Sequence, residues 1–129
     1  MKYNYSNKKD FNKNEYFHDL TYLGVSYDYL NRNLMIHFRN DSINKGINIQ
    51  IKSVLFFDMQ SCEFWNPGRY VYDIWIEDDC NVLDEYITLL NQNLSFSSHN
   101  FKNFQEYMFI ILKLNSGDEF RIICKEIIV

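Results

Sequence analysis

The sequence contains no alanine, one proline, four glycines and three cysteines. Without alanine, the strongest helix former, and with many β-branched and aromatic residues, the chain favours strands over helices. So few glycines leave no material for a phosphate-binding loop, and neither a P-loop nor a G-x-G-x-x-G motif is found. Cys62, Cys80 and Cys124 are odd in number and widely spaced, so we expect reduced thiols rather than a disulfide framework.

Long apolar runs are also lacking. No stretch reaches the roughly 18–20 residues that a membrane-spanning helix requires, and residues 1–9 lack the apolar region of a secretory signal. We therefore expect a cytoplasmic protein with no membrane partner. The 129 residues, 47% of them hydrophobic, are enough for one domain with a core. Residues 1–15, rich in Lys and Asn, are predicted to be a flexible segment that precedes a single β-rich domain at 16–129.

Positive charge is scarce in the middle of the chain. The formal net charge is −4, which argues against a nucleic-acid partner because such proteins usually carry a basic face. Residues 58–85 contain eight acids and one basic residue, Arg69, so this segment carries −7 and the remainder +3. An acidic segment of this kind is either a solvated surface without a partner or a docking surface for a basic protein.

Period-two alternation of apolar and polar residues predicts most of the strands. In the first hairpin, Leu23, Val25 and Tyr27 share one face, and residues 34–39 alternate after the turn at 31–33. Between residues 47 and 57 the apolar phase slips by one position. A slip of that kind would turn later side chains to the opposite face, so we expect a β-bulge near Ser53.

Two further elements complete the predicted fold. Apolar residues spaced by three and four between Val82 and Leu94 predict one helix. Residues 107–114 and 120–129 are apolar on both faces and flank an Asn-Ser-Gly-Asp turn, which predicts a hairpin in the centre of a sheet. The fold class is therefore mainly β (α+β): an antiparallel sandwich or strongly bent sheet of six or seven strands with one packed helix.

Motifs that carry chemistry are few. No pair of His or Cys residues has a chelating spacing, so we expect no metal and no other cofactor. His18-Asp19, at the entry to the first strand, has the residue types of a hydrogen-bonded general-base dyad, although an Asp at that position more often binds local backbone N–H groups. His18 and Asp19 are thus weak catalytic candidates, and we expect a protein that is not an enzyme.

Several short patterns resemble those of a family. They are Phe17-His18-Asp19, the alternating residues of the first hairpin, the run from Val54 to Trp65, and the Gly117-Asp118 turn. Together they resemble small, uncharacterised bacterial β-rich proteins in which a His-Asp pair precedes an N-terminal hairpin. Some members are similar to immunity proteins encoded beside secreted toxins. The resemblance covers residues 17–76 and 107–129 and implies an intracellular β-rich fold and toxin neutralisation, without any catalytic residue.

Two functions follow from these observations. The first is a protein-binding module, of the type of an immunity inhibitor of a basic bacterial toxin, in which aromatic anchors lie among carboxylates. Its predicted partner-binding residues are Glu63, Trp65, Asp73, Trp75, Glu77, Asp78 and Asp79. The second is a small enzyme or ligand-binding protein that uses His18, Asp19 and an aromatic pocket.

Overall fold

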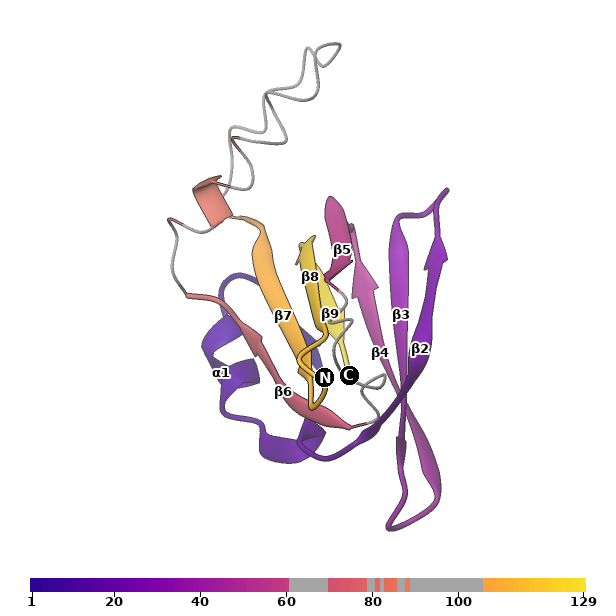
Figure 1. Ribbon diagram of the computed structural model, residues 1–129. Helices are drawn as coiled ribbons and strands as arrows, with labels where there is room; N and C mark the ends of the chain where they lie inside the picture. Colours follow the sequence, from indigo (N-terminus) through magenta and orange to yellow (C-terminus); the bar gives the residue numbers. More distant parts are fainter. Residues whose placement is uncertain (61–69, 79–80, 82, 86–87, 89–105) are drawn as a thin grey trace.

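The computed structural model describes residues 1–60, 70–78, 81, 83–85, 88 and 106–129. Nine strands in these ranges form two antiparallel sheets, with a short helix near the N-terminus (Figure 1). The elements are β1 (Lys2–Tyr3), α1 (Lys8–Asn12), the 3-10 helix η1 (Glu15–Phe17), β2 (Thr21–Asp28), β3 (Asn33–Asn40), β4 (Lys45–Lys52), β5 (Phe56–Gln60), β6 (Val71–Ile76), β7 (Met108–Leu114), β8 (Glu119–Cys124) and β9 (Glu126–Ile128).

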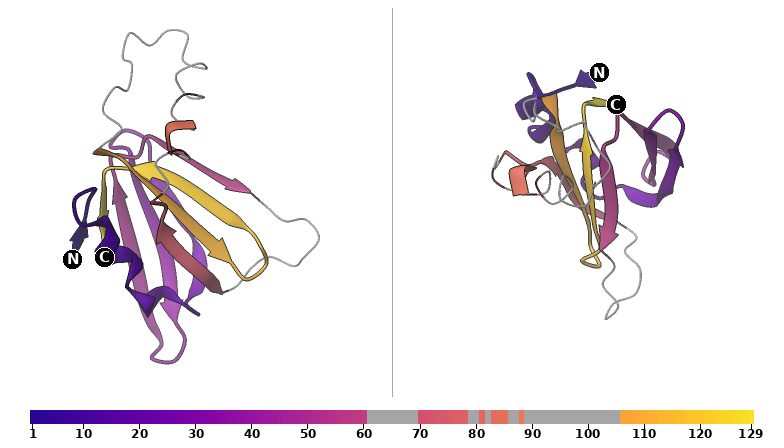
Figure 2. Two further views of the ribbon diagram at one scale, coloured as in Figure 1. Left: turned by 90° about the vertical axis from the view of Figure 1, so that its left-hand side faces the viewer. Right: turned by 90° about the horizontal axis from the view of Figure 1, so that it is seen from above.

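The two sheets form two layers with the main core between them (Figure 2). The first sheet, sheet A, has the order β1-β9-β4-β3-β2, and the second, sheet B, has the order β5-β8-β7-β6. The expected fold class, a mainly β antiparallel fold, is confirmed. The strands outnumber the expected six or seven because the chain adds the short β1 and divides its last stretch into β8 and β9.

Alternation within the strands supplies the core. Leu34, Ile36 and Phe38 of β3 and Ile49 and Ile51 of β4 are completely buried, and they face the inner side chains of sheet B. Burial of one such aliphatic side chain contributes about 1.5–3 kcal/mol. The polar residues between them lie on the outer face of sheet A, where they remain at least partly exposed.

The closing hairpin lies at the centre of sheet B, as its two apolar faces predict. β7 and β8 are flanked by β6 and β5, and Gly117 adopts a φ of 93° in the turn that joins them. Ile110 and Ile122 pack into the main core. On the opposite face Phe109 and Ile123 belong to a second apolar cluster.

The chain passes from one sheet to the other at two neighbouring points. β4 leads into β5 through Ser53, whose φ is 52°, and β8 leads into β9 through Lys125. The two crossings are joined, because the Lys125 N–H donates to the Lys52 carbonyl at 3.3 Å and the Leu55 N–H donates to the Ile123 carbonyl at 2.8 Å. The expected bulge near Ser53 is therefore wrong: the apolar phase slips there because the strand changes sheets.

A bulge does occur earlier, in β2. The pairing of β2 with β3 shifts between Tyr22 and Gly24, and Gly24 adopts a φ of 147° that side-chain-bearing residues rarely take. The bulge turns Leu23 outward, where it is 55% exposed, while Tyr22 and Val25 pack against the core. The expectation that Leu23 shares a face with Val25 is wrong for this reason.

The first 15 residues, expected to be a flexible segment, contain β1 and α1. Tyr3 and Phe11 are buried in the main core, where the Phe11 ring lies 5.2 Å from that of Tyr3 and 5.8 Å from that of Phe17. The Asn12 side chain also binds the backbone of Ile76 in β6, accepting from its N–H at 2.6 Å and donating to its carbonyl at 2.8 Å. Isolated aromatic residues in a polar stretch thus fix this segment to the sheets.

Most of the helix expected over Val82–Leu94 lies outside the described residues. Within it, Leu83, Asp84, Glu85 and Thr88 are helical, and the Thr88 hydroxyl donates to the Asp84 carbonyl at 2.8 Å. Leu83 is 9% exposed and belongs to the second apolar cluster on the outer face of sheet B.

Candidate functional site

Four of the seven predicted partner-binding residues lie in the described part of the chain, on β6 or directly after it. Asp73 and Trp75 lie on β6 with their side chains on the outer side of sheet B, and Glu77 and Asp78 follow that strand. Glu63, Trp65 and Asp79 lie outside the described residues.

Tyr72 is the most exposed of the apolar and aromatic side chains of β6. The pairing of β6 with β7 shifts between Val71 and Asp73, so Tyr72 is the extra residue of a bulge and is 60% exposed. Asp73 accepts a hydrogen bond from the Ile74 N–H at 2.8 Å, which orients its carboxylate beside the bulge. Bulges of this kind often re-aim a side chain at a functional site.

His18 and Asp19 lie beside this bulge. The His18 ring is 6.3 Å from the Tyr72 ring in an edge-on arrangement, and the Asp19 N–H donates to the Val71 carbonyl at 3.1 Å. Asp19 has a φ of 66°, a conformation that Asp adopts more readily than most residues. We call His18, Asp19, Tyr72 and Asp73 the His18–Tyr72 surface.

The expected dyad of His18 and Asp19 is open to solvent. The His18 Nδ1 and Asp19 Oδ1 atoms are 3.4 Å apart, and the two side chains are 61% and 84% exposed. Two depressions in the described part of the chain, one next to β2 and one next to α1, are lined by other residues. The geometry therefore suits contact with a large partner better than enclosure of a small substrate.

Other parts of the acidic segment are engaged within the protein. Trp75 is half-buried and packs against the second apolar cluster, and its indole N–H donates to Glu77 Oε2 at 3.3 Å. Asp78 pairs with Lys8 of α1 at 3.5 Å, and the Lys8 side chain is only 15% exposed. Glu77 and Asp78 therefore make contacts within the protein, and the ion pair of Asp78 with Lys8 joins the end of β6 to α1.

The polar end of the outer face of sheet B alternates in charge. Register places Lys113 of β7 between Asp73 of β6 and Glu119 of β8, and places Arg121 opposite Asp58 of β5. Arg121 donates to Glu119 Oε2 at 2.8 Å, and Asp58 Oδ1 is buried without a hydrogen-bond partner among the described residues. Acidic and basic residues alternate on neighbouring strands and attract one another, so this face is not uniformly acidic.

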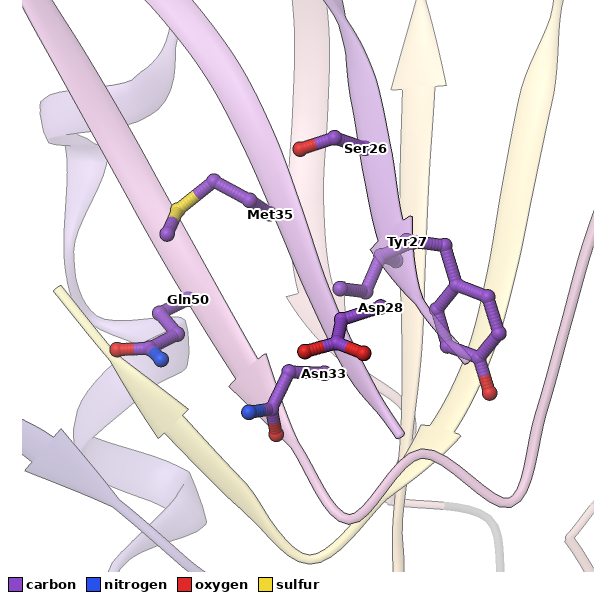
Figure 3. Close-up of a pocket in the computed structure, with 7 residues that line it drawn as sticks. Ser26, Tyr27, Asp28, Asn33, Met35 and Gln50 are labelled. Atoms are coloured by element: carbon purple, nitrogen blue, oxygen red, sulfur yellow. The ribbon is translucent and has the colours of Figure 1, made fainter. Parts of the chain in front are cut away.

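A second polar array went unnoticed in the sequence. On the outer face of sheet A, Ser26 of β2, His37 of β3 and Asn48 of β4 form a hydrogen-bonded row (neighbouring side chains are shown in Figure 3). The alternation over residues 34–39 predicts His37 on the polar side of its strand, and the structure confirms this position. The pairing of the two strands of the first hairpin would have been enough to place Ser26 near His37. The alternation of apolar and polar residues in β2 does not reveal the bulge at Leu23, which shifts that pairing.

Cys124 is completely buried, and its burial raises the pKa of the thiol far above the ordinary range. Cys62 and Cys80 lie outside the described residues. Within the described ranges, no three His, Cys, Asp or Glu side chains gather as metal ligands would. None of the helices there is both long and apolar enough to span a membrane.

Comparison with known proteins adds no further identification. No protein-family model matches the chain, and neither a curated protein nor a solved structure matches it.

Proposed function

We propose that this chain is a protein-binding module that docks a cationic protein through the His18–Tyr72 surface, in the manner of an immunity-type inhibitor of a basic toxin. The observation that carries the proposal is the 60% exposure of Tyr72 at a bulge between two exposed carboxylates. Tyrosine is enriched among the residues that dominate binding energy, because it offers a large apolar ring with one polar end.

The charge at this surface points to a basic partner. Among the described residues, no lysine or arginine forms an ion pair with Asp19 or Asp73, in contrast to Asp78 with its Lys8. Lys113 is the register partner of Asp73 without an ion pair to it, and the two carboxylates beside an aromatic ring complement a lysine- or arginine-rich surface. Such charges mainly speed the encounter of the two proteins, and salt weakens their effect.

Backbone hydrogen bonds hold the two segments of the His18–Tyr72 surface together in the unbound protein. The Asp19 N–H is bonded to Val71, and the Val71 N–H donates to the Leu20 carbonyl at 2.9 Å, so both segments that carry the surface are joined by backbone. Preorganisation of this kind lowers the entropy cost of association.

The test begins with the genes that flank the gene of this protein. Each product is expressed with and without the chain to find one whose toxicity the chain relieves, and binding is then measured with purified proteins. Tyr72→Ala should weaken binding by about 2 kcal/mol, or roughly 30-fold, mainly through faster dissociation. Asp19→Asn and Asp73→Asn should slow association at low salt and have little effect at high salt.

Tyr29→Ala is the matched control, because Tyr29 is 77% exposed in the turn between β2 and β3. Its binding should equal that of the wild type. Relief of toxicity that survives Tyr72→Ala and both Asp→Asn variants unchanged would refute the His18–Tyr72 surface as the docking site. If no flanking product is neutralised or bound, the immunity-type role is refuted.

A further inference from the structure

Three side chains on the outer face of sheet A have the connectivity of a nucleophile, a base and an orienting group. Ser26 Oγ lies 3.1 Å from His37 Nε2, and His37 Nδ1 lies 3.0 Å from Asn48 Oδ1. They come from the adjacent strands β2, β3 and β4, so the backbone pairing of three strands fixes their relative positions. Active serines are recognised by this geometry rather than by sequence position.

The hydrogen bonds determine which nitrogen of His37 carries the proton. An amide oxygen can only accept, so the contact with Asn48 Oδ1 places the proton on Nδ1. In the neutral ring Nε2 then has a free lone pair and accepts the hydrogen bond from the Ser26 hydroxyl. This is the tautomer that a general base for Ser26 requires.

Gly24 leaves room beside the imidazole. It pairs with His37 in the register of β2 and β3, and the position where its Cβ would stand has no atom within 4 Å. The space over this part of β2 is therefore open, and glycine is required here for its backbone φ of 147°.

A shallow depression of about 340 Å³ adjoins Ser26. Figure 3 shows Ser26, Met35 and Gln50 side by side across the three strands, with Asp28 and Asn33 beside them. The Met35 thioether gives the depression an apolar floor, and the amides of Asn33 and Gln50 offer hydrogen-bond donors at its rim.

We propose that Ser26 is a nucleophile that takes an acyl group from a small ester, with His37 as its general base and Asn48 as a positioning residue. Ser26 Oγ bonds to the acyl carbon while its proton passes to His37 Nε2. The bond from the acyl carbon to the leaving oxygen then breaks, and that oxygen takes the proton from Nε2. The products are acyl-Ser26 and the free alcohol, and water can release the acid by the same proton transfers in a second step.

The surroundings limit the substrate class. The Met35 floor favours a short apolar acyl chain, and the exposed Asp28 carboxylate disfavours an anionic one. Neutral or cationic esters of short-chain acids are thus the expected substrates.

The test uses the full chain with p-nitrophenyl acetate and p-nitrophenyl butyrate. Release of p-nitrophenolate is followed by absorbance, and the acylated residue is mapped by mass spectrometry of the intact and digested protein. We expect acylation at Ser26, its loss in Ser26→Ala, and acylation at least about 100-fold slower in His37→Gln. Ser42→Ala, which removes another exposed serine, should match the wild type.

Asn48 is tested by rescue. Asn48→Ala should slow acylation of Ser26, and Asn48→Asp, which keeps an acceptor for the Nδ1 proton, should restore it, while thermal melts show the same stability for both variants. A stable acyl-Ser26 without turnover supports the proposal, since acylation is the step assigned. No acyl group on Ser26 of the wild type, or unchanged acylation in His37→Gln, would overturn it. Mapping of the acyl group on the wild-type protein gives a result even if a variant fails to fold.

Discussion

Phe11 links the N-terminal segment to the core, and its removal has a calculable effect. The side chain is 1% exposed and lies between the rings of Tyr3 and Phe17. Helix α1 has only five residues, far below the length at which an isolated helix is stable, so packing must hold it. Phe11→Ala should therefore remove both the buried ring and the main anchor of residues 1–17.

The expected loss is about 3–5 kcal/mol, the range for truncating a buried phenylalanine. Against a total unfolding free energy of about 5–15 kcal/mol, this is a large fraction, and the melting temperature should fall by about 10–20 °C. If the segment were frayed instead, as its polar composition suggests, the loss would stay within about 0.5 kcal/mol, the usual range for surface substitutions.

Urea unfolding, followed by circular dichroism and extrapolated linearly to water, measures this difference. Tyr29→Ala is the control, because it removes an aromatic ring that is 77% exposed and should leave stability nearly unchanged. Equal unfolding free energies for Phe11→Ala and Tyr29→Ala would refute the docking of the segment. A loss confined to faster hydrogen exchange in β1 and β9 would show that the segment opens separately from the sheets.

Three further predictions concern single groups. Asn12→Ala should cost about 1–3 kcal/mol in urea unfolding, because it leaves the N–H and carbonyl of Ile76 without their side-chain partner, and Asn12→Asp should keep the acceptor but lose the donor. Cys124 should resist iodoacetamide in the native protein and react in urea, because burial raises the pKa of its thiol; rapid native labelling of its peptide would contradict this. Hydrogen bonds from the side chain and backbone of Asn31 lower the pKa of Asp28, so the stability they add is present above the ordinary Asp pKa and is lost as pH falls through the lowered value. Asn31→Ala should raise the pKa of Asp28 in an NMR titration, and an unchanged value would contradict the assignment.

Local pattern in the sequence determined the strands. Alternation in β3 and β4 identified the side chains that are buried, and the two apolar faces of the closing hairpin identified β7 and β8 as central strands. These inferences succeed because side chains alternate between the faces of a strand whatever it pairs with. They also place His37 on the polar face without the tertiary structure.

Only the tertiary structure decided which of these parts meet. The sequence singled out the His18-Asp19 pair and, separately, Asp73, but the backbone bond from Asp19 to Val71 places the pair beside the bulge at Tyr72. Packing against the second apolar cluster half-buries Trp75 on the outer side of sheet B. Contacts between residues far apart in sequence leave no local period. The same holds for the crossing at Ser53, the docking of Phe11 and the row from Ser26 to Asn48, since each depends on how strands pair and how sheets pack rather than on the residues beside it.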